Sequence, residues 1–231
     1  APGGRIYRPP ARPDDTTDAR GEALRTEIVA HGGAIDVRTG TEVLGIWGGR
    51  ELLWNRGDET GLLAADRIVL ATGAYDRPVP FPGWTLPGVL TAGAALGFAK
   101  VEGVRPGRRA LVAGTGPLLL VVAHHLHEAG VEVRAVLEAG FPPSSPRAWL
   151  RLWREWDLLR EAWGHWRRLR RAGIPLLFNH TVFAAEGRDE VERAVWGPVD
   201  PRDWSPVRDA ARTAEVDLVV TGFGFVPGIE L

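Results

Sequence analysis

The clearest pattern of apolar and polar positions lies in the middle of the chain. Residues 110–113 form a short apolar run that ends at a glycine, and residues 117–129 carry apolar side chains at helical spacing. Gly130 then precedes a second apolar run at residues 131–137. A short buried strand, a helix ended by glycine and another strand make one βαβ unit. The pattern therefore predicts parallel sheet in this part of the chain.

The N-terminal part shows shorter segments. Thr16, Thr17 and Asp18 are N-cap candidates for a helix that ends near Ala30. Strands are expected at residues 34–38, 41–47, 51–55 and 61–65, and a buried parallel strand at residues 67–71. Glycine pairs and Gly-Asp turns separate the second, third and fourth of these segments, so they are predicted to form an antiparallel meander.

Four prolines interrupt residues 76–90, which we interpret as a linker because proline breaks regular structure. A short helix is expected at residues 91–100. The remaining prediction, in chain order, is a helix at residues 146–172, strands at 175–178, 181–185 and 191–196, a polar loop at 198–214 and a strand at 217–221.

Composition narrows the function classes. The net charge of −1 and the even spread of arginine give no reason to expect nucleic acid or an anionic membrane as a partner. The absence of cysteine excludes disulfides and thiolate metal sites in these residues. No apolar run reaches the roughly 18 residues of a membrane span, and no signal peptide is visible, so we expect a cytoplasmic protein. The chain also lacks methionine and starts like the middle of a fold, so we expect a fragment.

The turn after the first central strand has the residues of a dinucleotide site. Gly114, Thr115 and Gly116 open the helix, where glycines let a pyrophosphate approach the helix N-terminus. Glu138, at the end of the next strand, is the candidate for the ribose hydroxyls and favours NAD over NADP. Leu119 replaces the third glycine of the fingerprint. The alternative is a Rossmann-like unit whose nucleotide site has decayed.

Two aromatic clusters allow a functional and a structural interpretation. His124 and His127 share a helix face, so a metal site is conceivable, but solvent-facing histidines are the favoured interpretation. Five tryptophans lie on one helical stripe, where core packing or subunit contact is favoured over a ligand platform: Trp149, Trp153, Trp156, Trp163 and Trp166. The four arginines after them mostly complement the helix dipole. No spacing marks an acid, a base or a nucleophile, so any chemistry would belong to a cofactor.

Two further motifs resemble one flavoprotein family. Residues 1–7, APGGRIY, resemble a segment that follows the first βαβ unit of pyridine nucleotide-disulphide-type flavoproteins. Residues 71–89 resemble the pattern ATGAxxRxxPxPGWxxPGV of the flavin-dependent α or A subunits of opine oxidase, hydrogen cyanide synthase and amine or proline dehydrogenases. Residues 217–231 resemble the strand that returns to the flavin domain.

The resemblance implies a three-layer, Rossmann-like α/β fold that binds two dinucleotides and carries a small antiparallel β-meander. We expect a truncated FAD-binding domain at residues 1–105, an NAD(P)-binding-like domain at 106–222 and the start of a return to the FAD domain at 223–231. The first GxGxxG unit of the family would lie before residue 1, and a further flavin segment would lie after residue 231.

The family motifs also imply cofactor-binding residues. They place Gly3 and Gly4 near the flavin, Val43 near the adenine, Thr72 and Gly73 beside the FAD phosphate or ribityl chain, and Gly222 and Phe223 near the second nucleotide site of Gly114, Thr115, Gly116 and Glu138. Arg5 stands where the family usually has glutamine. The missing cysteines rule out disulfide reductase chemistry in these residues.

Three functional hypotheses follow from the resemblance. The first is an FAD-dependent oxidoreductase subunit that oxidises an amine, imino acid or opine-like substrate and passes electrons to a second subunit or another acceptor. The second is a non-catalytic nucleotide-binding or scaffolding subunit of such a complex. The third is an NADH-dependent flavin reductase. The implied cofactors are FAD and, at the second nucleotide site, NAD or ATP.

Overall fold

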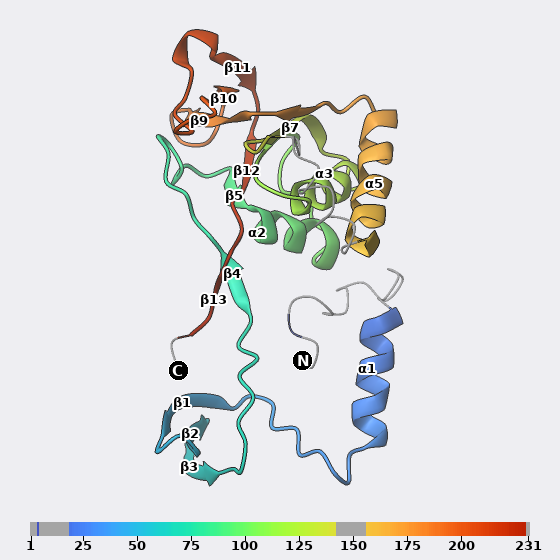
Figure 1. The fold of residues 1–231 in the computed structure, drawn as a ribbon, viewed down its shortest axis with the longest axis vertical. Coiled ribbons are helices and arrows are strands. Elements are labelled where there is room, and N and C mark those ends of the chain that lie inside the picture. Colours follow the sequence, from blue (N-terminus) through green and yellow to red (C-terminus); the bar gives the residue numbers. More distant parts are fainter. Residues whose placement is uncertain (1–3, 5–18, 142–155, 230–231) are drawn as a thin grey trace. The chain divides into compact units, whose positions relative to one another are not determined.

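A computed structural model of the chain describes residue 4, residues 19–141 and residues 156–229 (Figure 1). These residues divide into two compact units, residues 1–75 with 227–231 and residues 76–226. The chain therefore passes between the units twice. At these two points strand β4 (Ala74–Asp76) pairs with strand β13 (Phe225–Pro227).

The second unit is built on a five-stranded sheet. In spatial order its strands are β5 (Val89–Thr91), β12 (Leu218–Gly222), β6 (Arg109–Gly114), β7 (Glu132–Glu138) and β8 (Leu176–Phe178). All four pairings are parallel. Both faces of such a sheet are covered, which is why its central strands are apolar at nearly every position. Strand β6 shows this most simply, because Ala110 and Val112 face one hydrophobic cluster whereas Leu111 and Ala113 face another.

Helices cover one face of this sheet (Figure 1). They are α2 (Ala92–Leu96), α3 (Leu118–Glu128) and α5 (Trp156–Arg171), and a π-helical turn, η1 (Gly97–Val101), continues α2. The apolar side of α3 is fully buried in the cluster that this face shares, through Leu119, Val122 and Leu126. The connections β6-α3-β7 and β7-α5-β8 are therefore βαβ crossovers, and the first of them was predicted from the sequence.

The other face is covered by a three-stranded antiparallel sheet. Its order is β11 (Arg212–Glu215), β10 (Arg193–Pro198) and β9 (His180–Glu186). Helices, parallel sheet and antiparallel sheet make three layers, so the predicted three-layer α/β fold is confirmed. The prediction of a loop throughout residues 198–214 was wrong, because β11 and a 3-10 turn, η3 (Arg208–Ala210), lie there. The open edge of β10 supplies the hydrogen-bond partners that let this polar segment form a strand.

The first unit holds helix α1 (Ala19–Ala30) and the predicted meander. Its strands are β1 (Glu42–Trp47), β2 (Glu51–Arg56) and β3 (Glu59–Ala64), which pair antiparallel in chain order. Gly48 and Gly49 have φ angles of 54° and 74°, values that two-residue hairpin turns require. The meander forms because its turn residues specify it locally.

Two strands predicted for this unit do not form. Residues 34–38 and 67–71 have no regular structure, and their apolar side chains are partly or largely exposed, up to 88% for Val69. A strand depends on hydrogen bonds to a neighbour, and none of the described residues pairs with these segments. An apolar run is therefore not sufficient to make a strand here.

The remaining predictions agree with the structure over the residues it describes. The predicted helix at 146–172 is present from Trp156 to Arg171, while residues 142–155 and the N-cap candidates at 16–18 lie outside the described residues. Residues 76–90 are irregular except at their two ends, where β4 finishes and β5 begins. Strand β5 and helix α2 precede residue 106 but pack in the second unit. The assignment of an FAD domain and an NAD(P)-like domain stays a prediction.

Candidate functional site

The glycine turn between β6 and α3 is shaped by the neighbouring strand β12. Gly114 has a φ angle of 152°, and a Cβ atom built on it would lie 2.0 Å from the carbonyl oxygen of Gly222. The Thr115 amide donates a 2.8 Å hydrogen bond to that same oxygen. Position 114 therefore needs glycine because the β12 backbone approaches it closely. The structure brings Gly222, expected near the second nucleotide site, into direct contact with the turn, and Phe223 follows it half-buried.

Glu138 lies against the same turn. One carboxylate oxygen accepts a 2.7 Å hydrogen bond from the Gly116 amide, and the other accepts a 2.8 Å bond from the Gly140 amide. The Ala139 amide donates to the Gly114 carbonyl at 2.8 Å, which fixes the end of β7 beside the end of β6. The carboxylate thus lies where the sequence predicted, at the N-terminus of α3. Its binding to a ribose stays a prediction.

The turn uses several of its own amides for these contacts. Thr115 donates to Gly222, Gly116 donates to Glu138, and Pro117 has no N–H. Pro117 is also the N-cap residue and makes no side-chain capping bond. A phosphate that bound here would therefore compete with the Glu138 carboxylate for the Gly116 amide. Glu138 controls how much of the helix N-terminus a ligand can reach.

Leu119, which replaces the third glycine of the fingerprint, packs in the core. Its side chain is 1% exposed and belongs to the cluster between the sheet and the helices. A Cβ atom on Gly222 would lie 3.1 Å from the Leu119 side chain and 2.9 Å from that of Ala92. The missing glycine on the helix is therefore matched by a glycine on β12, which leaves room for the leucine. The substitution that suggested a decayed site is accommodated by packing.

The expected flavin-side residues belong to the first unit. Thr72 donates its hydroxyl hydrogen bond to the Gly228 carbonyl, and the Gly228 amide donates to Gly73 at 3.0 Å. Gly4 and Gly73 have φ angles of 54° and 80°, with open space where a side chain would stand. Val43 is half-buried in β1, where it pairs with Trp54. Gly3 lies outside the described residues.

One polar contact near the linker was missed from the sequence. Asp76 accepts a 2.7 Å hydrogen bond from the Thr91 hydroxyl and a 3.1 Å bond from the Gly93 amide. Thr91 in turn caps helix α2 by accepting from the Ala94 amide. Asp76 therefore ties the start of the second unit to the N-terminus of α2. A threonine directly before an alanine-rich helix is the signal that could have located the cap.

The histidines of α3 differ from their predicted exposure. His127 is exposed, but His124 is only 6% exposed and lies between α3 and α5, so the expectation that it faces solvent was wrong. Its Nε2 atom is 3.2 Å from an Arg168 nitrogen and 3.4 Å from a Glu128 oxygen, and its ring centre is 4.9 Å from that of His165. The packing of α5 onto α3 buries it.

Burial lowers the pKa of His124, His125 and His165 below the ordinary imidazole value. Glu128, which contacts both histidines of α3, opposes this effect without reversing it. The described residues hold no group of three or more side chains arranged to bind a metal ion. The cluster is therefore a set of neutral imidazoles at a helix interface.

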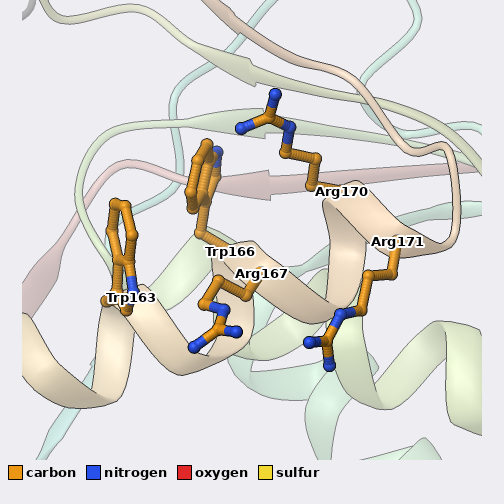
Figure 2. A pocket seen from close by; sticks show the side chains of 5 residues that line it. All are labelled: Trp163, Trp166, Arg167, Arg170 and Arg171. Carbon is orange, nitrogen blue, oxygen red and sulfur yellow. The ribbon is translucent and has the colours of Figure 1, made fainter.

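The outer face of α5 carries the described part of the tryptophan stripe (Figure 2). Core packing was the wrong interpretation for Trp163, which is 57% exposed. Its ring centre lies 4.6 Å from that of Trp166, and the Arg170 guanidinium lies 5.2 Å from the centre of the Trp166 ring. Trp149 and Trp153 lie outside the described residues. No helix among the described residues is long and apolar enough to cross a membrane.

Comparisons with known proteins place the chain in a family. The family model described as pyridine nucleotide-disulphide oxidoreductase matches residues 9–231. The chain is 35% identical over 237 residues to the hydrogen cyanide synthase subunit HcnB of Pseudomonas aeruginosa, which covers 100% of this chain and 51% of that protein. It is 48% identical over 82 residues to the A subunit of the opine oxidase of Rhizobium meliloti, covering 36% of this chain and 16% of that protein.

Solved structures show the same fold. The thioredoxin reductase of T. acidophilum matches with a TM-score of 0.57 at 17% identity, over 90% of this chain and 60% of that one. An NAD-dependent persulfide reductase from A. fulgidus matches with a TM-score of 0.56 at 23% identity, over 94% of this chain and 36% of that one. The chain spans about half the length of the HcnB relatives. It belongs to the pyridine nucleotide-disulphide oxidoreductase family.

Proposed function

We propose that the chain is part of an FAD-dependent oxidoreductase subunit that oxidises an amine, imino acid or opine-like substrate and delivers electrons to a partner subunit or another acceptor. The observation that carries this proposal is the 35% identity to HcnB over the whole chain. The similarity to large subunits of opine oxidase and sarcosine oxidase supports the substrate class. A cytoplasmic location is part of the same proposal.

The residues of the first unit fit an extended cofactor. Gly4 and Gly73 have open space in place of a side chain, so a flavin phosphate or ribityl chain could lie against the backbone there. Thr72 holds the backbone of this segment through its bond to Gly228. A bound flavin would accept a hydride from the substrate carbon next to nitrogen. These residues would bind and orient it.

The residues of the second unit fit a nucleotide. Gly114, Thr115 and Gly116 place backbone amides at the start of α3, and Glu138 holds the carboxylate that would accept hydrogen bonds from a ribose. We propose NAD as the ligand, with ATP as the competing possibility. The bond from the Gly116 amide to Glu138 is also the observation that favours the second function, a nucleotide-binding or scaffolding subunit, because the turn is satisfied without a ligand.

Anaerobic reduction of the flavin tests the oxidoreductase. A longer, flavin-loaded form of the protein should lose its oxidised visible spectrum when mixed with sarcosine, an opine or another secondary amine. No reduction by any such compound would contradict the proposed reaction and leave the scaffolding function. Reduction by NADH alone would support the flavin reductase.

Calorimetry tests the nucleotide site on the present chain. NAD should bind, ATP should bind more weakly, and Glu138→Ala should reduce NAD affinity by about tenfold because a charge-assisted hydrogen bond contributes about 1.5–3 kcal/mol. Glu132→Ala, at the exposed start of the same strand, is the matched control. Tighter NAD binding by Glu138→Ala would mean that the carboxylate blocks the turn and would overturn its ribose role.

A further inference from the structure

Helix α5 has two faces of different character. His165 and Leu169 lie on the side that packs against α3, where Leu169 is 3% exposed. The neighbouring side carries two tryptophans and three arginines, Trp163, Trp166, Arg167, Arg170 and Arg171, which we call the Trp/Arg face (Figure 2). Their spacing of three, four, seven and eight residues after Trp163 puts them on one helical stripe. They line an open pocket of about 400 Å³.

This face leaves groups of high binding capacity without partners among the described residues. Trp163 is 57% exposed although an indole gains much from burial. None of the carboxylates in the described residues forms an ion pair with Arg167, Arg170 or Arg171, whereas Glu161 of the same helix lies 4.0 Å from His165. The face is thus both aromatic and positively charged on a chain whose net charge is −1.

The face is also partly ordered in advance. The two indole rings lie 4.6 Å apart with an interplanar angle of 34°, and Arg170 lies over Trp166. Such stacking restricts the side chains before a partner arrives, which reduces the entropy lost on binding. Tryptophan and arginine are the residues most enriched at the energetic centres of protein interfaces, and guanidinium groups match carboxylates in geometry.

We propose that the Trp/Arg face is the docking site for an acidic surface, carrying apolar or aromatic side chains, of a partner subunit. Charge complementarity selects this occupant, because three guanidinium groups around two indoles require carboxylates beside an apolar contact. The preceding residues 142–155 do not supply it, since they contain three arginines and one acidic residue. The proposal rests on the proposed function insofar as it takes the chain to be one subunit of an assembly.

Fluorescence anisotropy with a defined probe tests the docking site. The probe is a labelled, amidated helical peptide with glutamate and phenylalanine on one face, and its control carries lysine in place of glutamate. The glutamate peptide should bind and the lysine peptide should not. The triple variant Arg167→Glu, Arg170→Glu, Arg171→Glu should weaken binding by about tenfold or more, and Trp163→Ala should also weaken it.

A matched charge change separates this face from net charge. The triple variant Arg188→Glu, Arg202→Glu, Arg208→Glu alters three exposed arginines of the same unit and should leave peptide binding unchanged. In the assembled longer protein, reversal of the three α5 arginines should shift sedimentation from the complex to the free subunit, whereas the control triple should not.

Four results would overturn the proposal. They are equal binding of both peptides, retention of binding by the α5 triple variant, tighter binding of a labelled oligothymidylate, and concentration-dependent self-association that the α5 triple variant abolishes. The last two would assign the face to single-stranded nucleic acid or to a second copy of the chain. Peptide binding needs no flavin and no turnover, so its failure is distinguishable from failure of the proposed oxidation.

Discussion

The two units of the molecule differ most in where their apolar side chains go. Every buried hydrophobic residue of the described structure lies between Ala92 and Val220, within the second unit. In the first unit Gly21 is the one buried residue among those described, and α1 and the meander leave most of their apolar side chains partly exposed. Both units contain the helices and hairpins that their local patterns predict. Local pattern therefore determines the elements, whereas a core requires elements from distant parts of the chain.

The sharpest test of this comparison is to separate the units. Residues 76–226, a continuous segment, should fold alone and unfold cooperatively with a free energy of about 5–15 kcal/mol, because they contain both hydrophobic clusters. Residues 1–75 alone should show no cooperative transition. Denaturant titration followed by circular dichroism measures both. A cooperative transition of residues 1–75 would contradict the conclusion that this unit lacks a core of its own.

A pair of leucine substitutions makes the same comparison within the whole chain. Leu126→Ala should lower the free energy of unfolding by about 2–5 kcal/mol, because Leu126 is completely buried on α3. Leu62→Ala, in the first unit, should change it by less than about 0.5 kcal/mol, because Leu62 is 68% exposed on β3. Equal effects in equilibrium denaturation would show that both leucines are buried in solution.

Two glycine substitutions compare turns that have the same local signature. Gly73→Ala should cost about 1–2 kcal/mol, since a positive φ strains an L-residue but nothing lies near the new Cβ atom. Gly114→Ala should cost clearly more, because its Cβ atom would lie 2.0 Å from the Gly222 oxygen and β12 would have to move. Thermal unfolding of the two variants measures the difference. A smaller loss for Gly114→Ala would contradict the close approach of β12 to the turn.

The smallest predicted effect is a pH dependence confined to the second unit. The pKa values of His124, His125 and His165 are lowered in the folded state, so the unfolded chain binds more protons below about pH 6.5. Their contribution to stability is complete above that pH and decreases as the pH falls toward the folded pKa values. The groups around them are Glu128, Glu161, Arg168 and Lys100.

Denaturation of residues 76–226 at a series of pH values measures this effect. The variant His124→Gln, His165→Gln should lose less stability than the native sequence between neutral and mildly acidic pH. His127→Gln, on the exposed side of the same helix, should follow the native curve. A curve for the double variant that matches the native one would place the pH dependence elsewhere.

Much of the fold could be predicted because its signals are local. The run at 110–113, the glycine turn, the helix to residue 129 and the next strand carry their own periodicity and stop signals, and the structure confirms them. The position of Glu138 followed from the same unit, because parallel strands joined by one helix end at the same edge. Loss of the third glycine was also visible, but its consequence was not. That consequence depends on Gly222, more than one hundred residues further along the chain.

The predictions that failed depend on neighbours that the sequence does not reveal. Residues 67–71 read as a buried strand, but a strand exists only where another backbone satisfies its hydrogen bonds. His124 and Trp163 have helical spacing that suits either burial or exposure, and the packing of α5 onto α3 decided which one is covered. The sequence by itself determined the α/β elements, the glycine turn and the family. Tertiary structure alone decided which faces are buried, because burial is a property of two surfaces and periodicity describes only one.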